Sequence, residues 1–135
     1  MNIFDIYLDK IKKLIIRLNK EGSIELPESL ININVDIPPS NFDFDISTNA
    51  PMVLSKINKK KPLDIANHLI PIIKNEDINI FNIEVANPGF INIKFKASFW
   101  NEFVKEILDN HDKFGINTKE QKKKYLIEFV SANPT

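Results

Sequence analysis

The strongest candidate for a binding site is the segment at residues 90–96, which has the sequence Phe-Ile-Asn-Ile-Lys-Phe-Lys. Side chains alternate between the two faces of a strand, so the apolar residues Ile91, Ile93 and Phe95 are expected to share a buried face. The opposite face would then carry Phe90, Asn92, Lys94 and Lys96. An aromatic ring can stack on an unpaired base, an amide can hydrogen-bond to a base edge, and lysines can meet phosphates. The pattern therefore indicates a local RNA-binding surface.

A second interpretation of the same residues stays open from the pattern alone. Phe90 can simply cover the adjacent turn at residues 87–89, while the amide and the two lysines solvate the strand. Gly89 suits both interpretations, because a glycine supplies the turn and also lets a ligand approach the backbone.

Other residues with reactive side chains give little support for catalysis. His68 lies among apolar residues of a helical pattern and His111 in a polar segment, and neither has a reactive partner at a useful spacing. The carboxylates Asp36, Asp43 and Asp45 do not follow the ligand spacing of a calcium loop. With no cysteine and three glycines, the chain offers no thiolate site and no phosphate-binding glycine loop. We expect no catalytic residue, metal site or cofactor within these 135 residues.

The end of the sequence follows a different pattern. Residues 125–130 form a largely apolar run, which is typical of a parallel strand buried on both faces. Small polar residues follow it, and open α/β sheets bind their ligands at the carboxyl ends of strands. We interpret residues 125–135 as the beginning of another domain.

Hydrophobic periodicity predicts the elements that position these residues. Helical spacing predicts helices at residues 3–18, 49–58, 62–75 and 99–108, and Pro71 is expected to kink or shorten the third. Alternation predicts strands at residues 31–37, 81–85 and 90–96, and an edge strand or ordered loop at 42–46. This order is not a regular βαβ alternation, so the expected fold class is α+β. We expect a small four-stranded antiparallel sheet packed on helices in two layers, followed by a linker and an orphan strand.

The charge balance restricts the classes of partner. Lysine and arginine number 18, aspartate and glutamate also 18, and the formal net charge is zero. A protein that holds nucleic acid by bulk electrostatics would carry a basic excess, so any such binding must be local. No run of 18 apolar residues and no basic leader occurs, so we expect neither a membrane span nor a secretory signal. The absence of cysteine fits a reducing cytosol.

Several segments together resemble the N-terminal region of bacterial arginyl-tRNA synthetases. Residues 128–135, Glu-Phe-Val-Ser-Ala-Asn-Pro-Thr, resemble the segment that opens the catalytic domain of that family. Residues 44–52 resemble its Gly-Asp-Leu-Ala-Thr-Asn-Ala-Ala-Met segment, and residues 87–93 its Gly-Pro-Gly-Phe-Ile-Asn hairpin. The pair Phe114-Gly115 also recurs before the linker. The resemblance covers essentially the whole chain.

The resemblance implies a division into three parts. Residues 1–115 would form the N-terminal tRNA-recognition domain, residues 116–124 a linker, and residues 125–135 the truncated start of the Rossmann catalytic domain. In the family, the first domain contacts the D-loop at the elbow of tRNA. The positions that match this contact are Phe90 and Asn92, and the tRNA-binding surface implied around them adds Gly89, Lys94 and Lys96.

The resemblance also implies the activity of the full-length enzyme, which would attach arginine to tRNA(Arg) with ATP and Mg²⁺. Ser131 and Asn133 match positions that bind the amino and carboxyl groups of arginine. The His-containing ATP-binding signature would lie beyond Thr135, so we expect this chain alone to be inactive. The implied partners are tRNA(Arg) and the rest of the catalytic domain. The resemblance also implies a full-length enzyme that is monomeric, lies in the cytoplasm and does not bind a membrane.

One function of a different class remains as the alternative. A non-catalytic protein-interaction module would dock the same sheet face onto a protein partner. In either case the strand at residues 125–130 would lack the domain that covers it, so we expect it to fray, to extend the sheet or to mediate self-association.

Overall fold

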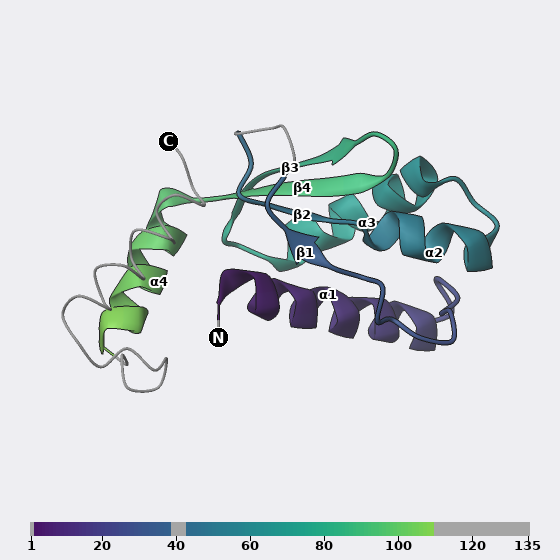
Figure 1. The fold of residues 1–135 in the computed structure, drawn as a ribbon, viewed down its shortest axis with the longest axis horizontal. Coiled ribbons are helices and arrows are strands. Elements are labelled where there is room, and N and C mark those ends of the chain that lie inside the picture. Colours follow the sequence, from purple (N-terminus) through teal and green to yellow (C-terminus); the bar gives the residue numbers. More distant parts are fainter. Residues whose placement is uncertain (1, 39–42, 110–135) are drawn as a thin grey trace.

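The computed structural model describes residues 2–38 and 43–109 (Figure 1). The predictions on His111, the linker at 116–124, the strand at 125–130, Ser131 and Asn133 lie outside the described residues. In chain order the elements are α1 (Ile3–Lys20), β1 (Val35–Asp36), β2 (Ile46–Thr48), α2 (Ala50–Asn58), α3 (Pro62–Glu76), β3 (Ile80–Ala86), β4 (Phe90–Phe95) and α4 (Ala97–Asp109). Within the described ranges, no helix has the length and apolar character needed to cross a membrane.

The strands of the described residues form one four-stranded antiparallel sheet in the order β1-β2-β4-β3. β3 and β4 make the predicted hairpin, and β2 pairs with the other side of β4. The α+β class and the small antiparallel sheet are therefore confirmed. Of the two alternatives for residues 42–46, the edge strand is wrong: residues 43–45 lie outside any strand, and β2 begins only at Ile46 and lies between β1 and β4. Alternation shows which way side chains face, but it does not show which strands pair.

α1 follows directly from local sequence signals. The Oδ1 atom of Asn2 accepts a hydrogen bond of 3.0 Å from the N–H of Asp5 and caps the first turn. Gly22 adopts a φ of +79° just after the last turn, a backbone conformation that glycine adopts without strain. The buried positions recur at helical spacing and are Ile3, Tyr7, Ile11, Ile15 and Leu18. The predicted helix is confirmed, with its end at Lys20.

The alternating segment at residues 31–37 forms much less strand than predicted. Only Val35–Asp36 pairs in the sheet, and Ile31 and Ile37 are exposed. The reason lies in Asn49, whose side-chain amide donates to the carbonyl of Asn32 (3.0 Å) and accepts from the N–H of Asn34 (2.8 Å). These backbone groups bond to a side chain, so they do not join a strand ladder.

α3 continues through Pro71 as far as Glu76, so the helix predicted at residues 62–75 is confirmed and its shortening at Pro71 is not. Proline removes one helical hydrogen bond. The buried side chains Ile65, Ala66, Leu69 and Ile73 hold both halves of the helix against the core, so Pro71 does not shorten it.

The two faces of the sheet differ in character. On one face Ile46 and Ile83 flank Ile93 in register, and this face joins the buried side chains of α1, α2 and α3 in one hydrophobic cluster. These helices lie along the sheet in Figure 1. The alternate positions of β2, β3 and β4 make up the other face, which we call the polar face: Ser47, Asn82, Glu84, Phe90, Asn92 and Lys94.

Candidate nucleic-acid interface

The hairpin turn before β4 is built on a close approach to two helices. A Cβ atom at Gly89 would lie 2.3 Å from the Cβ of Pro62 and 3.0 Å from the Cγ of Met52. Gly89 is buried. The packing of α2 and α3 against the turn therefore accounts for this glycine, and on that side no room remains for a ligand.

The side chains of β4 lie on the faces that alternation predicts, but they are not all exposed as expected. Phe90 and Lys94 are half-buried and Lys96 is exposed, but Asn92 is only 4% exposed. The expectation that Asn92 lies on an open surface is therefore wrong. β4 is an inner strand, and Asn92 has Ser47 of β2 opposite it on one side and Glu84 of β3 on the other. The period of the strand predicts the face of Asn92 correctly, but it does not predict how far the side chain is exposed.

Two side-chain oxygens at the centre of the polar face have no hydrogen-bond partner in the described part of the chain. They are the Oδ1 of Asn92 and the Oγ of Ser47, and both are closed off from solvent. Leaving a buried polar atom unpaired costs about 1–3 kcal/mol, so such atoms are rare in native proteins. The Oδ1 of Asn92 can accept a hydrogen bond from a ligand, and the hydroxyl of Ser47 can either donate one to the ligand or accept one from it. The sequence reasoning missed Ser47, because only the register of β2 against β4 brings it opposite Asn92.

One end of the polar face carries a buried carboxylate. The Oδ2 of Asp45 accepts hydrogen bonds from the N–H of Phe95 (2.7 Å) and from the Nε1–H of Trp100 (3.4 Å). Burial raises the pKa of Asp45 above its usual range, and these hydrogen bonds and the charge of Lys94 oppose that shift. Among the described residues, no group of three or more His, Cys, Asp or Glu side chains is arranged to hold a metal ion. Through its two hydrogen bonds, Asp45 connects the start of β2 to the end of β4 and to α4.

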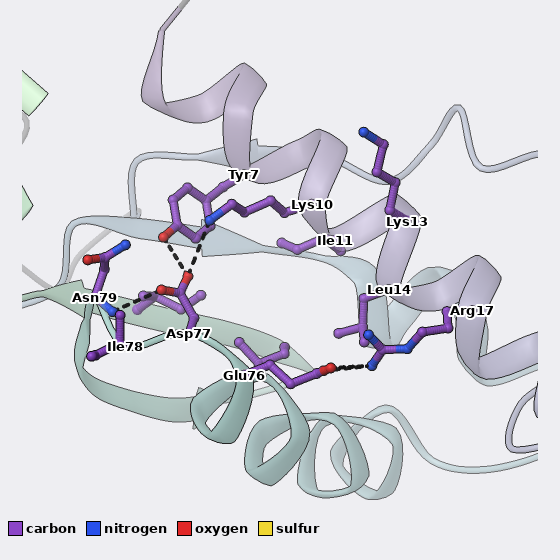
Figure 2. Close-up of a pocket in the computed structure, with 12 residues that line it drawn as sticks. Tyr7, Lys10, Ile11, Lys13, Leu14, Arg17, Glu76, Asp77, Ile78 and Asn79 are labelled. Carbon is purple, nitrogen blue, oxygen red and sulfur yellow. Dashed lines mark hydrogen bonds and ion pairs between the residues drawn. The ribbon is translucent and has the colours of Figure 1, made fainter. Parts of the chain in front are cut away.

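A hollow of about 560 Å³ between α1 and the end of α3 offers a second polar environment (Figure 2). The hydroxyl of Tyr7 donates to Asp77 Oδ2 at 2.6 Å, and the Nζ of Lys10 lies 3.8 Å from the same oxygen. Burial, followed by the hydrogen bond to Asp77, raises the pKa of Tyr7 well above its ordinary value. Because a carboxylate already faces these donors, the hollow is a poor site for an anion such as phosphate.

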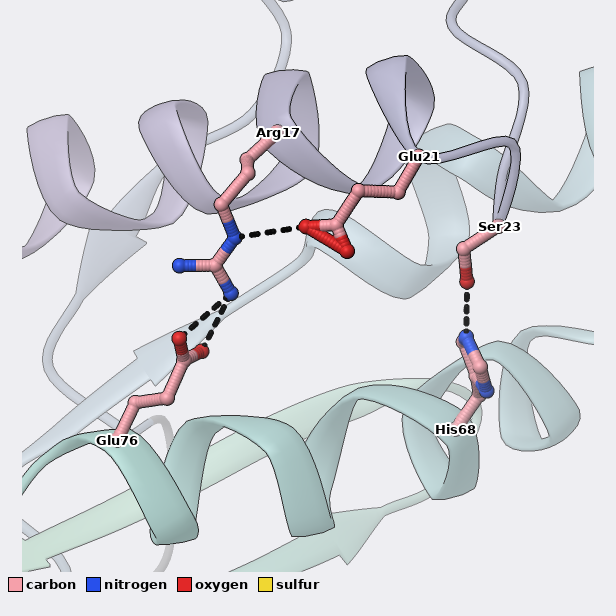
Figure 3. Close-up of polar contacts among 5 residues, drawn as sticks. All are labelled: Arg17, Glu21, Ser23, His68 and Glu76. Atoms are coloured by element: carbon pink, nitrogen blue, oxygen red, sulfur yellow. Dashed lines mark hydrogen bonds and ion pairs between the residues drawn. The ribbon is translucent and has the colours of Figure 1, made fainter.

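Basic side chains of α1 are also paired with carboxylates, as Figure 3 shows for Arg17. The Nη2 of Arg17 lies 2.6 Å from Glu76 Oε1, and its Nε lies 3.3 Å from Glu21. Lys13 pairs with Asp9 at 2.9 Å. These contacts support a solvated helix surface over a phosphate-binding stripe.

His68 has a structural partner. Its Nε2 lies 2.8 Å from the Oγ of Ser23 in an exposed contact that joins the loop after α1 to α3 (Figure 3). Among the described residues, no third side chain is hydrogen-bonded to this pair. The contact therefore gives no support to a catalytic role for His68.

The sequence of this chain is similar to those of known proteins. The family described as "Arginyl tRNA synthetase N terminal domain" matches residues 6–95. The chain is 70% identical over all of its 135 residues to an arginine–tRNA ligase of Pelagibacter ubique, and 42% identical over the same length to one of Bartonella tribocorum. It is 31% identical to an arginine–tRNA ligase of Staphylococcus aureus over 136 aligned residues, again across the whole chain. The chain spans about a quarter of the length of these relatives, 23%, 23% and 24% respectively.

Proposed function

Since this chain belongs to the arginyl tRNA synthetase N-terminal domain family, we propose that it is the tRNA-recognition part of an arginine–tRNA ligase. The resemblance read from the sequence motifs is confirmed by the family match and by ligase relatives that align along the whole chain. The complete protein would attach arginine to tRNA(Arg) in the cytoplasm with ATP and Mg²⁺. Residues 1–115 would form the RNA-binding domain, and Ser131 and Asn133 would bind arginine in the domain that begins near residue 125.

The proposed contact is between the polar face and an unpaired base at the D-loop of tRNA(Arg). The observation that carries it is the unpaired, buried Oδ1 of Asn92, two residues from the half-buried ring of Phe90 on the same face. A base would stack on Phe90 and donate a hydrogen bond to Asn92, while Lys94 and Lys96 meet the adjacent phosphates. Because the Oδ1 of Asn92 is closed off from solvent, the base would reach it only after a local rearrangement of the polar face.

The charge balance of the chain is compatible with this function. A domain that reads one base needs a ring and an amide in the correct places, and only a few local lysines. With a net charge of zero, it would bind tRNA weakly on its own. The rest of the ligase would then provide most of the phosphate contacts.

A chimeric ligase provides the test. In it, this chain replaces the matching 135 residues of the Pelagibacter ubique enzyme. Phe90→Ala should raise the KM for tRNA(Arg) by about 5- to 150-fold, because the loss of one stacked base costs about 1–3 kcal/mol. The KM for arginine and the kcat at saturating tRNA should stay close to the parent values. Phe81→Ala is the matched control, because Phe81 is an exposed phenylalanine of the neighbouring strand β3.

A protein-interaction module is the second candidate function. It is favoured by the exposed apolar side chains Ile78 and Phe81, which are 81% and 64% exposed at the β3 edge of the sheet. Sedimentation of the chain distinguishes the two functions. A salt-insensitive complex of the chain together with unchanged tRNA kinetics in the Phe90→Ala chimera would favour protein interaction.

A further inference from the structure

We infer that Ser47 is a second RNA-contacting residue, which acts with Asn92 to hold the hydrogen-bonding edge of an unpaired base. This inference rests on the proposed function and extends it to a residue on a different strand.

The register of the sheet places the two side chains together. Ser47 of β2 and Asn92 of β4 are directly opposite each other, and each is 4% exposed. Side chains at opposite positions of an antiparallel pair have Cβ atoms about 4.5–5.5 Å apart. The oxygens of both are nevertheless without a hydrogen-bond partner, so they do not satisfy each other.

The neighbouring residue shows that this is a special position within β2. Thr48 points to the opposite face, where its hydroxyl donates to the carbonyl of Asn34 (2.8 Å) and accepts from the N–H of Ala50 (3.2 Å). The hydroxyl of Thr48 therefore makes two hydrogen bonds within the fold, whereas the hydroxyl of Ser47 makes none with the described residues. Buried polar atoms are normally paired, and within residues 2–38 and 43–109 the hydroxyl of Ser47 has no partner, so it is available to a ligand.

The chemistry of the two oxygens identifies the class of partner. A carbonyl oxygen such as Asn92 Oδ1 can only accept, so the ligand must present a donor, either an N–H or an O–H. A phosphate offers acceptors and no donor, which excludes it as the partner of this atom. The Ser47 hydroxyl can donate or accept, so it can bond to a donor or to an acceptor that lies next to the group bonded to Asn92. The edge of an unpaired base carries donors and acceptors side by side, and it fits this pair.

Access to the pair requires a local movement. Phe90 and Lys94 lie two residues before and after Asn92, on the same face of β4, and both are half-buried. If the ring of Phe90 shifts to stack on the incoming base, the same movement opens the way to Asn92 and Ser47. Stacking and edge recognition would therefore occur together.

The test compares Ser47→Ala with Thr48→Ala in the chimeric ligase. Loss of a ligand hydrogen bond at Ser47 should raise the KM for tRNA(Arg) about 3- to 10-fold. Because the Ser47 hydroxyl has no partner in the free protein, its removal should leave the Tm unchanged or raise it. Thr48→Ala should instead lower the Tm, because it removes two hydrogen bonds of the fold, and should leave the KM for tRNA nearly unchanged.

Three outcomes would overturn the inference. If Ser47→Ala leaves the KM for tRNA unchanged while Phe90→Ala raises it, the proposed function stands and the role of Ser47 fails. If neither variant changes that KM, both fail. If Ser47→Ala lowers the Tm as Thr48→Ala does, the hydroxyl serves the fold and is not reserved for a base.

Discussion

The Oδ2 atom of Asp45 accepts a hydrogen bond of 2.7 Å from the backbone N–H of Phe95, and both residues are buried. The same oxygen faces the indole N–H of Trp100 at 3.4 Å. This carboxylate therefore joins the residues before β2 to the end of β4 and to α4. It fixes the end of the polar face from which Lys94 and Lys96 project, so its protonation state affects the stability of the surface that we propose for RNA.

We predict that Asp45→Asn changes how stability depends on pH. Burial raises the pKa of Asp45 in the folded chain, so the folded state binds its proton more tightly than the unfolded state. The stability from this group is fully present below its unfolded pKa of about 3.9 and is lost as pH rises through the folded value. Between pH 4 and pH 7, urea unfolding should show the wild type losing free energy of unfolding relative to Asp45→Asn. A constant difference across that range, or the opposite trend, would contradict the assignment.

Much of the fold follows from the sequence, and the site only in part. The helical spacing of residues 3–18 and the hairpin around Gly89 predict real elements, because local periodicity and turn chemistry determine them. Alternation predicts the correct face for Asn92 but not its 4% exposure, and it cannot show that Ser47 of β2, 45 residues earlier in the chain, lies opposite it. The short β1 depends on Asn49, a tertiary contact across 15 and 17 residues that no local pattern contains.

Gly89→Ala should destabilise the chain because of steric overlap. The new methyl would lie 2.3 Å from the Cβ of Pro62, whose ring cannot move without displacing the start of α3. Overpacking of this kind costs about 1–3 kcal/mol or more. Gly22→Ala is a suitable control, because its Cβ would meet nothing within 4 Å and only its positive φ is unfavourable. The midpoint of urea unfolding should fall further for Gly89→Ala, and a smaller fall than for Gly22→Ala would refute this role.

Tyr7→Phe should test the bond between α1 and the end of α3. Removing the hydroxyl deprives Asp77 of a bond of 2.6 Å, and a hydrogen bond to a charged group contributes about 1.5–3 kcal/mol. Burial raises the pKa of Tyr7, so its contribution is fully present below the ordinary tyrosine pKa of about 10 and declines above it. Chemical unfolding at pH 7 and at pH 10.5 should show a larger loss for Tyr7→Phe at pH 7. Equal losses at the two values would show that Tyr7 ionises normally in the folded chain.

Lys96→Ala should weaken tRNA binding in a salt-dependent way. Lys96 is exposed just beyond the end of β4, where we place an RNA phosphate. In the chimeric ligase the slope of log affinity against log salt should become shallower by about 1, because one fewer counterion is released. Lys60→Ala serves as the control, since Lys60 is an exposed lysine between α2 and α3, and it should leave the slope unchanged. Identical slopes for the parent and Lys96→Ala would show that Lys96 does not contact an RNA phosphate.

The most direct test of the central claim is a nuclear magnetic resonance titration of the ¹⁵N-labelled 135-residue chain with tRNA(Arg), which detects weak binding residue by residue. We predict that the largest shift changes fall on the side-chain amide of Asn92 and on the backbone of Ser47 and Phe90. The exposed side of α1 and the β3 edge at Phe81 should change little. Changes confined to α1 or to that edge, with Asn92 unaffected, would contradict base recognition by the polar face.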